Sequence, residues 1–157
     1  EEGEFNYVIY GTLLMGVGAV AYWGPKLWGR ALPQSAVFGL GTLGFLGTVL
    51  ASLPLYIAGF ANQPAGLVDG FSYDGPQELW NGLAAAGQAI IAVTVLLFLL
   101  TALRAFTSGK SAGDDPWDAQ TLEWSVSSPA PVDNFVSVPS VKSAEPLLDV
   151  KPAGSQQ

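Results

Sequence analysis

The chain has 157 residues, of which 50% are hydrophobic and only 12% are charged, and its net charge is −7 at pH 7. It contains no cysteine and no histidine, which excludes disulfides, thiolate or imidazole metal ligands, and catalysis by either side chain. The acidic balance argues against nucleic acid as a partner, because phosphate binding needs clustered Lys and Arg, and the composition favours a membrane protein.

Three long runs without charged side chains predict three membrane-spanning helices, at about residues 5–24, 36–60 and 79–104. Each run is long enough, since a hydrocarbon core of about 30 Å needs roughly 20 helical residues. Pro54 is expected to kink the second helix, and a neighbouring helix is expected to satisfy the carbonyl that this proline frees. The predicted fold class is an all-α membrane protein whose three transmembrane helices occupy residues 1–106.

The basic residues near these runs predict the orientation of the helices. They follow the first and third runs, and they are Lys26, Arg30, Arg104 and Lys110. The loop after the second run contains Asp69 and Asp74 and no cation. Because Lys and Arg near membrane segments tend to stay on the cytoplasmic side, we expect a multi-pass protein of the bacterial plasma membrane with its N terminus outside and its C terminus in the cytoplasm. The acidic loop is either a solvated connection or a surface that attracts a basic partner.

Residues 107–157 have a different character, because Ser, Pro, Gly and Asp alternate with isolated apolar residues without helical or strand periodicity. We expect an irregular cytoplasmic tail that is disordered near its end. Its central part contains two tryptophans and several prolines, so we expect it to lie on the surface of a partner. The predicted contact residues are Asp115, Pro116, Trp117, Leu122, Glu123 and Trp124.

Small and polar residues within the predicted helices indicate helix packing. In lipid, helices associate where small side chains let their backbones approach closely, and uncharged polar groups form hydrogen bonds across such contacts. The residues predicted to pack are Gly11, Gly18, Gly41, Gly44, Gly47 and Gln88. The alternative for Gln88, a polar route for protons, is weakly supported, because no ionisable residue occurs inside the three runs.

The order of these segments resembles the end of haem-copper oxidase subunit I. Residues 5–30 read FNYVIYGTLLMGVGAVAYWGPKLWGR and are similar to the tenth helix of that family and its cytoplasmic turn. Residues 53–66, LPLYIAGFANQPAG, resemble the end of the eleventh helix, and residues 79–106 resemble the twelfth. The tail is the most specific part: SAGDDPWDAQTLEWSVSSPAPVDNF is similar to the bacterial pattern AGxDPWxxxTLEWxxxSPPPxxNF. The resemblance covers nearly the whole chain and implies the same topology as the loop charges.

Two haem-ligand positions of that family are replaced in this sequence. The family reads HFHYVL, and its two histidines hold the high-spin and low-spin haem irons, whereas the matching positions here are Glu4 and Asn6. Neither residue is expected to act as a ligand in place of imidazole. The family also places an arginine pair for the haem propionates after the last loop proline, and here Ala65 and Gly66 follow Pro64. We therefore expect no cofactor on this chain, and haem a and copper in a partner complex.

The leading hypothesis is a non-catalytic structural subunit of a respiratory cytochrome c oxidase or larger respiratory assembly, whose partners are other membrane subunits and lipid. One alternative is the C-terminal half of a split subunit I that contributes to the oxygen-reducing, proton-pumping core. A second is a free-standing membrane assembly factor. A deletion strain separates the first two hypotheses, because only the split enzyme loses its haem a spectrum.

Overall fold

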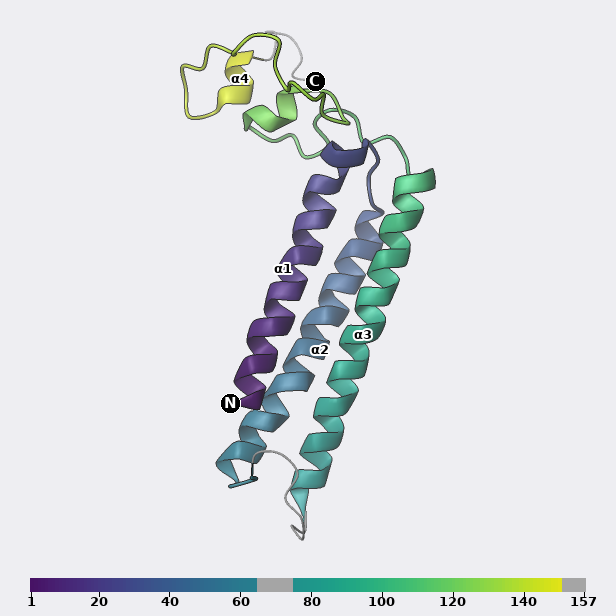
Figure 1. Ribbon diagram of the computed structural model, residues 1–157, viewed down its shortest axis with the longest axis vertical. Helices are drawn as coiled ribbons and strands as arrows, with labels where there is room; N and C mark the ends of the chain where they lie inside the picture. Colours follow the sequence, from purple (N-terminus) through teal and green to yellow (C-terminus); the bar gives the residue numbers. More distant parts are fainter. Residues whose placement is uncertain (65–74, 151–157) are drawn as a thin grey trace. The chain divides into compact units, whose positions relative to one another are not determined.

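The computed structural model describes residues 1–64 and 75–150, and their fold is all-α (Figure 1). The long helices are α1 (Glu2–Trp28), α2 (Gln34–Phe60) and α3 (Pro76–Ser108), and each is long and apolar enough to cross a membrane. The described ranges contain no strand, only an isolated antiparallel bridge between Arg30 and Ser111. The predicted fold class is therefore confirmed.

The chain divides into two compact units, and each contains segments that are distant in sequence. We call the first the helical unit; it comprises Glu1–Gly18 and Gln34–Thr101. We call the second the tail unit; it comprises Ala19–Pro33 and Ala102–Gln157, of which residues up to 150 are described. Each unit is considered by itself below.

All three long helices are longer than the apolar runs that predicted them. After α1, Gly29 adopts a left-handed φ of 77° and its N–H donates to the Pro25 carbonyl at 2.8 Å. After α2, Asn62 has a φ of 59°, and Gln63 N–H donates to the Ala58 carbonyl at 3.0 Å. Such left-handed caps satisfy the last carbonyls of a helix. Hydropathy marks only the part of a helix that is apolar, whereas capping decides where the helix ends.

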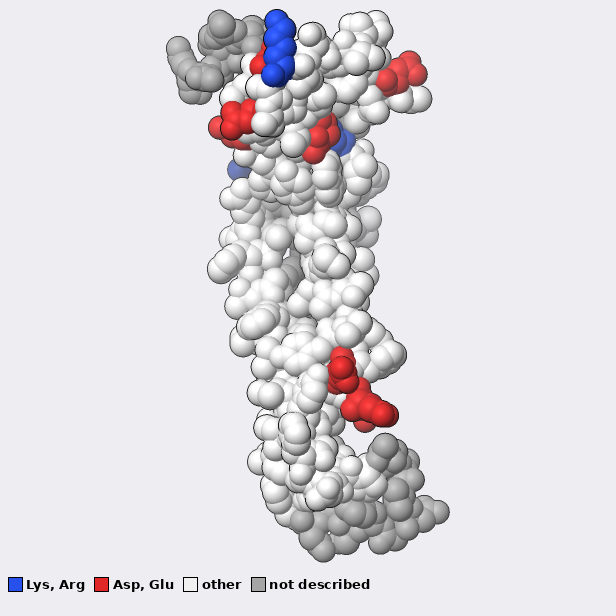
Figure 2. Space-filling view, turned by 90° about the vertical axis from the view of Figure 1, so that its left-hand side faces the viewer, with Lys and Arg blue, Asp and Glu red and all other residues white. Residues whose placement is uncertain are grey.

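In the helical unit, consecutive helices run in opposite directions, and α2 lies beside both α1 and α3 (Figure 1). The buried residues of the helical unit are mostly small or apolar and include Gly44, Gly47, Ala51 and Ala58 of α2 and Ala84, Ile91 and Phe98 of α3. Large apolar side chains point outward instead, for example Phe38 at 79% exposure and Met15 at 71%. Figure 2 shows a broad surface of this kind without charged side chains. Apolar side chains on the outside are what a helix surface in contact with lipid requires.

The tail unit contains two short helices, η1 (Leu122–Ser125) and α4 (Pro146–Val150), which contact each other. Leu147 on α4 is only 1% exposed, and its N–H donates to the Gln120 carbonyl at 2.9 Å. Disorder is predicted from about residue 142 onward, and residues 142–150 of that stretch are described and include α4. The residues beyond 150 lie outside the described residues, as do Ala65, Gly66, Asp69 and Asp74 of the loop before α3.

Candidate functional site

The side chain at the second of the two haem-ligand positions, Asn6, is engaged within the helical unit. Asn6 is 8% exposed, and its Nδ2 donates a hydrogen bond to the carbonyl oxygen of Ala51 on α2 at 3.1 Å. One turn earlier on α1, a Cβ added to Gly3 would lie 2.9 Å from the Ser52 carbonyl oxygen. Only a glycine permits this approach, so Gly3 brings the two backbones close enough for the amide of Asn6 to reach α2.

Glu4, at the first ligand position, is exposed, in contrast to Asn6. Successive residues of a helix point in directions about 100° apart, so Asn6 and Gly3 share the face toward α2 while Glu4 does not. The Tyr7 and Tyr56 rings, with centroids 6.2 Å apart, continue the contact between α1 and α2. The structure therefore separates the two positions that the resemblance associates with haem iron.

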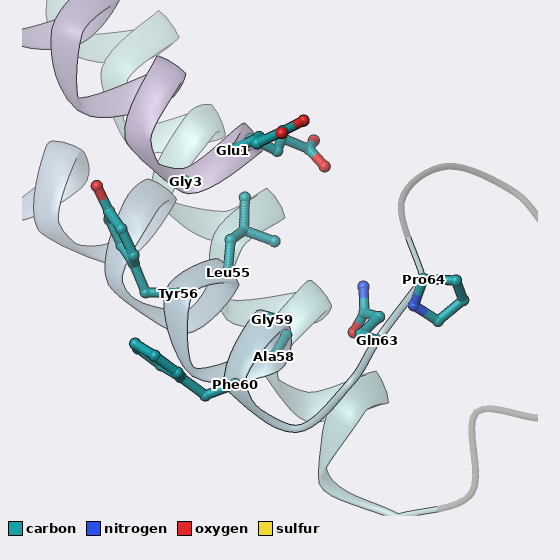
Figure 3. Close-up of a pocket in the computed structure, with 10 residues that line it drawn as sticks. Glu1, Gly3, Leu55, Tyr56, Ala58, Gly59, Phe60, Gln63 and Pro64 are labelled. Carbon is teal, nitrogen blue, oxygen red and sulfur yellow. The ribbon is translucent and has the colours of Figure 1, made fainter.

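A cavity of about 380 Å³ lies where the start of α1 meets the end of α2 (Figure 3). Its lining is largely apolar and includes Leu55, Tyr56 and Phe60, with Gln63 and Pro64 after the helix. The charged groups in this lining are the carboxylates of Glu1 and Glu2. Figure 3 shows Glu1 at the start of α1, close to Leu55. Because the described side chains that line this cavity include two carboxylates and no Lys or Arg, they repel anionic groups such as haem propionates.

The five glycines predicted to pack fall into two sets. A Cβ on Gly44 would meet Thr94 of α3 at 3.3 Å, and a Cβ on Gly47 would meet Ile90 at 2.9 Å, so these two glycines lie at helix contacts of this chain. In the part of the chain that the structure describes, a Cβ added to Gly11, Gly18 or Gly41 has no atom within 4 Å apart from the backbone of its own helix. Packing between helices of the chain thus accounts for two of the five, and the other three leave narrow places on open helix faces.

On α3, the close contact is made by the residue before the predicted one. An added Cβ on Gly87 would overlap the backbone of Leu50 and Ala51, whereas the neighbouring Gln88 is exposed. Gly87 was missed because the two glycines of α3, Gly82 and Gly87, are five residues apart and so do not follow the three- or four-residue spacing of one helix face. At the end of α2, Gln63 and Asn81 exchange hydrogen bonds between their side-chain amides, at 3.0 and 3.3 Å.

The two tryptophans of the tail pack on α1 within the tail unit. The Trp117 ring stacks on the Tyr22 ring at a centroid distance of 5.6 Å, and its Nε1 donates to the Tyr22 carbonyl at 3.1 Å. Trp124, 1% exposed, stacks on the Trp23 ring at 5.7 Å. Both residues were predicted to contact a partner, which stays a prediction; the contacts seen in the structure are with α1 of this chain.

The other four predicted tail residues are partly exposed. The Asp115 Oδ1 accepts a hydrogen bond from the Ala119 N–H at 2.9 Å, and the Leu122 carbonyl accepts one from Ser125 Oγ at 2.6 Å. Pro116 lies next to Trp117 in sequence, and Glu123 lines a small recess beside Lys26. Contact of these residues with a partner stays a prediction.

Lys26 holds the tail in place, whereas from the sequence its charge predicted only the orientation of the helices. Its side chain is 5% exposed, and its Nζ donates to the carbonyls of Asp114 at 2.9 Å and Val126 at 2.6 Å. The same Nζ lies 5.2 Å from the centre of the Trp124 ring, within the range of a cation–π contact. The Lys26 carbonyl accepts from the Ala130 N–H at 3.1 Å, so this one residue holds three points of the tail.

Among residues 1–64 and 75–150, no group of three or more Asp or Glu side chains is placed to hold a metal ion. The long apolar spans and their outward-facing side chains define a multi-pass helical membrane protein. No protein-family model matches the chain.

Curated relatives identify the family more closely. The chain is 33% identical over 143 residues to cytochrome c oxidase subunit 1 of Thermostichus vulcanus. The match covers 88% of this chain and 25% of that protein. It is 34% identical over 153 residues to cytochrome c oxidase subunit 1 of Bacillus subtilis, and the match covers 96% of this chain and 24% of that protein. A probable cytochrome c oxidase subunit 1 of Bradyrhizobium diazoefficiens is 34% identical over 159 residues, and the match covers 98% of this chain and 23% of that protein. The chain is thus a homologue of haem-copper oxidase subunit I that spans about a quarter of the length of these relatives.

Proposed function

We propose that this chain is a non-catalytic membrane subunit of a respiratory cytochrome c oxidase or larger respiratory assembly, derived from the C-terminal part of subunit I. The observation that carries the proposal is the Asn6 side chain, which occupies a haem-ligand position of the family and donates its hydrogen bond to Ala51 instead.

The groups at the expected haem position do not fit haem. An amide is a poor ligand for iron, and the Asn6 amide is buried against α2. The Glu4 carboxylate is exposed, and the nearby cavity has two carboxylates where haem propionates need cations. The proposal therefore assigns no cofactor to this chain and places haem a and copper on partner subunits.

Open helix faces support a role in packing. Gly11, Gly18 and Gly41 give the helical unit narrow places that its own helices leave uncovered, and Gln88 is exposed on a span where lipid offers no hydrogen bond. Helices of other membrane subunits would bury the small residues and supply a partner for the amide. The expected neighbours are therefore transmembrane helices of the same complex, with lipid on the remaining faces.

The proposed orientation places the N terminus outside and the C terminus in the cytoplasm. The four cations near the spans, Lys26, Arg30, Arg104 and Lys110, all belong to the tail unit. Positive residues next to membrane helices favour the cytoplasmic side. The partly exposed Asp115, Pro116 and Glu123 would then face a neighbouring subunit there.

Purification of the oxidase from native membranes tests the proposal. We expect the chain at a fixed ratio to a subunit I with intact histidines, and its absence from every respiratory complex contradicts the proposal. Gly41→Leu is expected to lower the retention of the chain in the complex without lowering its own unfolding midpoint, because a Cβ at that position meets no other helix among the described residues. Gly41→Ala, which adds one methyl group, is the matched control.

The main alternative is a split subunit I, which is favoured by the match to subunit 1 relatives over 88% or more of this chain. Deletion of the chain separates the two functions. A retained haem a spectrum with weakened assembly supports the structural subunit, and loss of the spectrum supports the split enzyme. Association with assembly intermediates alone indicates an assembly factor.

A further inference from the structure

Two of the long helices contain a proline in their interior, Pro25 in α1 and Pro54 in α2. A proline has no N–H, and its ring crowds the preceding turn, so the backbone hydrogen bonds there are lost or weakened. The carbonyls left without their regular donor are those four residues earlier, Ala21 and Leu50, and the next carbonyl shares the disturbed turn. In hydrocarbon no water replaces the lost donor.

In both helices, a side chain that is distant in sequence donates to the carbonyl three residues before the proline. Asn6 Nδ2 donates to the Ala51 carbonyl, three residues before Pro54, at 3.1 Å. Trp117 Nε1 donates to the Tyr22 carbonyl, three residues before Pro25, also at 3.1 Å. In both units the accepting carbonyl thus lies one residue after the carbonyl that the proline leaves without its regular donor.

The Asn6 bond is the more protected of the two. Asn6 is 8% exposed and Ala51 is fully buried, whereas Trp117 is partly exposed. The close approach at Gly3 excludes lipid from the same interface. A hydrogen bond that crosses two helices in such surroundings links the position of α1 to the proline turn of α2.

We propose that Asn6 is a positioning residue, whose amide stabilises the proline-containing turn of α2 and holds α1 against it. This inference concerns the fold of the chain itself and stands whichever complex contains it. It gives the amide a physical task at a place where the family resemblance leads one to expect an iron ligand. The proline and the amide then form one device, so each should matter less when the other is absent.

A double-mutant cycle on the full chain in lipid nanodiscs tests this coupling. Asn6→Leu removes the donor and is expected to lower the unfolding midpoint by about 2–4 °C, the shift for about 1 kcal/mol in a chain of this size. Pro54→Ala restores a backbone N–H to the turn. In the Pro54→Ala background, Asn6→Leu is expected to lower the midpoint by less than half as much.

Thr12→Val is the matched control, because Thr12 Oγ1 donates at 2.7 Å to the Val8 carbonyl of its own helix. It should show the same small effect in the wild-type and Pro54→Ala backgrounds. If Asn6→Leu alone is not recovered folded, Pro54→Ala should rescue it, and failure in both backgrounds overturns the proposal. An Asn6→Leu shift that is absent, or equal in the two backgrounds, overturns it as well.

Discussion

The contacts inside the helical unit differ in kind from the contacts inside the tail unit. In the helical unit the close contacts are at glycines: Gly3 and Gly87 lie against the backbone of α2, and Gly47 lies against the side chains of Ile90 and Ile91. Among the described residues, side-chain hydrogen bonds between the helices of this unit are few. In the tail unit the contacts are between large groups: the Tyr22 and Trp124 rings meet at 5.3 Å, and a buried lysine binds two carbonyls.

This difference follows from the surroundings and the backbone structure of each unit. Apolar helices in lipid gain nothing by burying more apolar surface, so they gain stability from close backbone approach. The tail has no regular backbone pairing over most of its length, so buried rings and a charged donor must fix its path. Substitutions should therefore act mainly through lost contacts in the tail unit and mainly through added volume in the helical unit.

The largest effect is expected for Trp124→Ala. This ring is 1% exposed and contacts Tyr22, Trp23 and Lys26, so its removal should destabilise the tail unit by about 3–5 kcal/mol. Hydrogen exchange on the full chain should show loss of protection over residues 112–135. Trp80→Ala, a tryptophan of the helical unit, is the control and should leave that protection unchanged.

Lys26→Met should have the next largest effect. The substitution keeps an unbranched side chain but leaves the Asp114 and Val126 carbonyls without their donor, at a cost of roughly 2–3 kcal/mol. Limited proteolysis should cut the tail faster, at sites between residues 112 and 131. Lys142→Met removes an exposed lysine of the same unit as a control, and equal cleavage of both variants would contradict the role given to Lys26.

In the helical unit, Gly87→Ala should destabilise by about 1–2 kcal/mol, because the new methyl group overlaps the backbone of Leu50 and Ala51. The unfolding midpoint of the full chain in nanodiscs measures this. Gly82→Ala on the same helix is the control. Among the described residues no atom of another helix lies within 4 Å of a Cβ there, and alanine favours the helix, so the midpoint should hold or rise. A loss of similar size in both variants would argue against backbone contact as the basis of this unit.

The three helices could be predicted from sequence because uncharged apolar runs of this length are typical of membrane spans and rare in water-soluble folds. Their ends could not, because Gly29 and Asn62 end helices by local backbone conformation. The spacing of Gly44 and Gly47 indicated a narrow face, but spacing does not identify the neighbour that uses it. Gly41 belongs to the same pattern and is open.

The sequence identified which residue types stand at the candidate site, but not which residues they contact. The replaced ligands at Glu4 and Asn6 could be recognised from the resemblance alone. The bond from Asn6 to Ala51 joins residues 45 apart, and those from Lys26 to the tail join residues 88 and 100 apart, so only tertiary structure reveals them. Trp117 and Trp124 were predicted to contact a partner, which stays a prediction, and their contacts with α1 of this chain could not be assigned from composition.

The smallest effect tests whether the tail unit depends on rings and Lys26 rather than on its exposed end. The Asp149 carboxylate accepts hydrogen bonds from the Lys142 and Ser143 N–H groups, both at 2.7 Å. These bonds lower the pKa of Asp149 from its ordinary value of 3.8. A lowered folded-state pKa stabilises this turn above pH 3.8, and the contribution is lost as the pH falls through the folded value. Exchange of those two amides should accelerate in Asp149→Asn at neutral pH, with protection over residues 112–135 unchanged. Loss of protection there as well would mean that the exposed turn helps to hold the aromatic contacts.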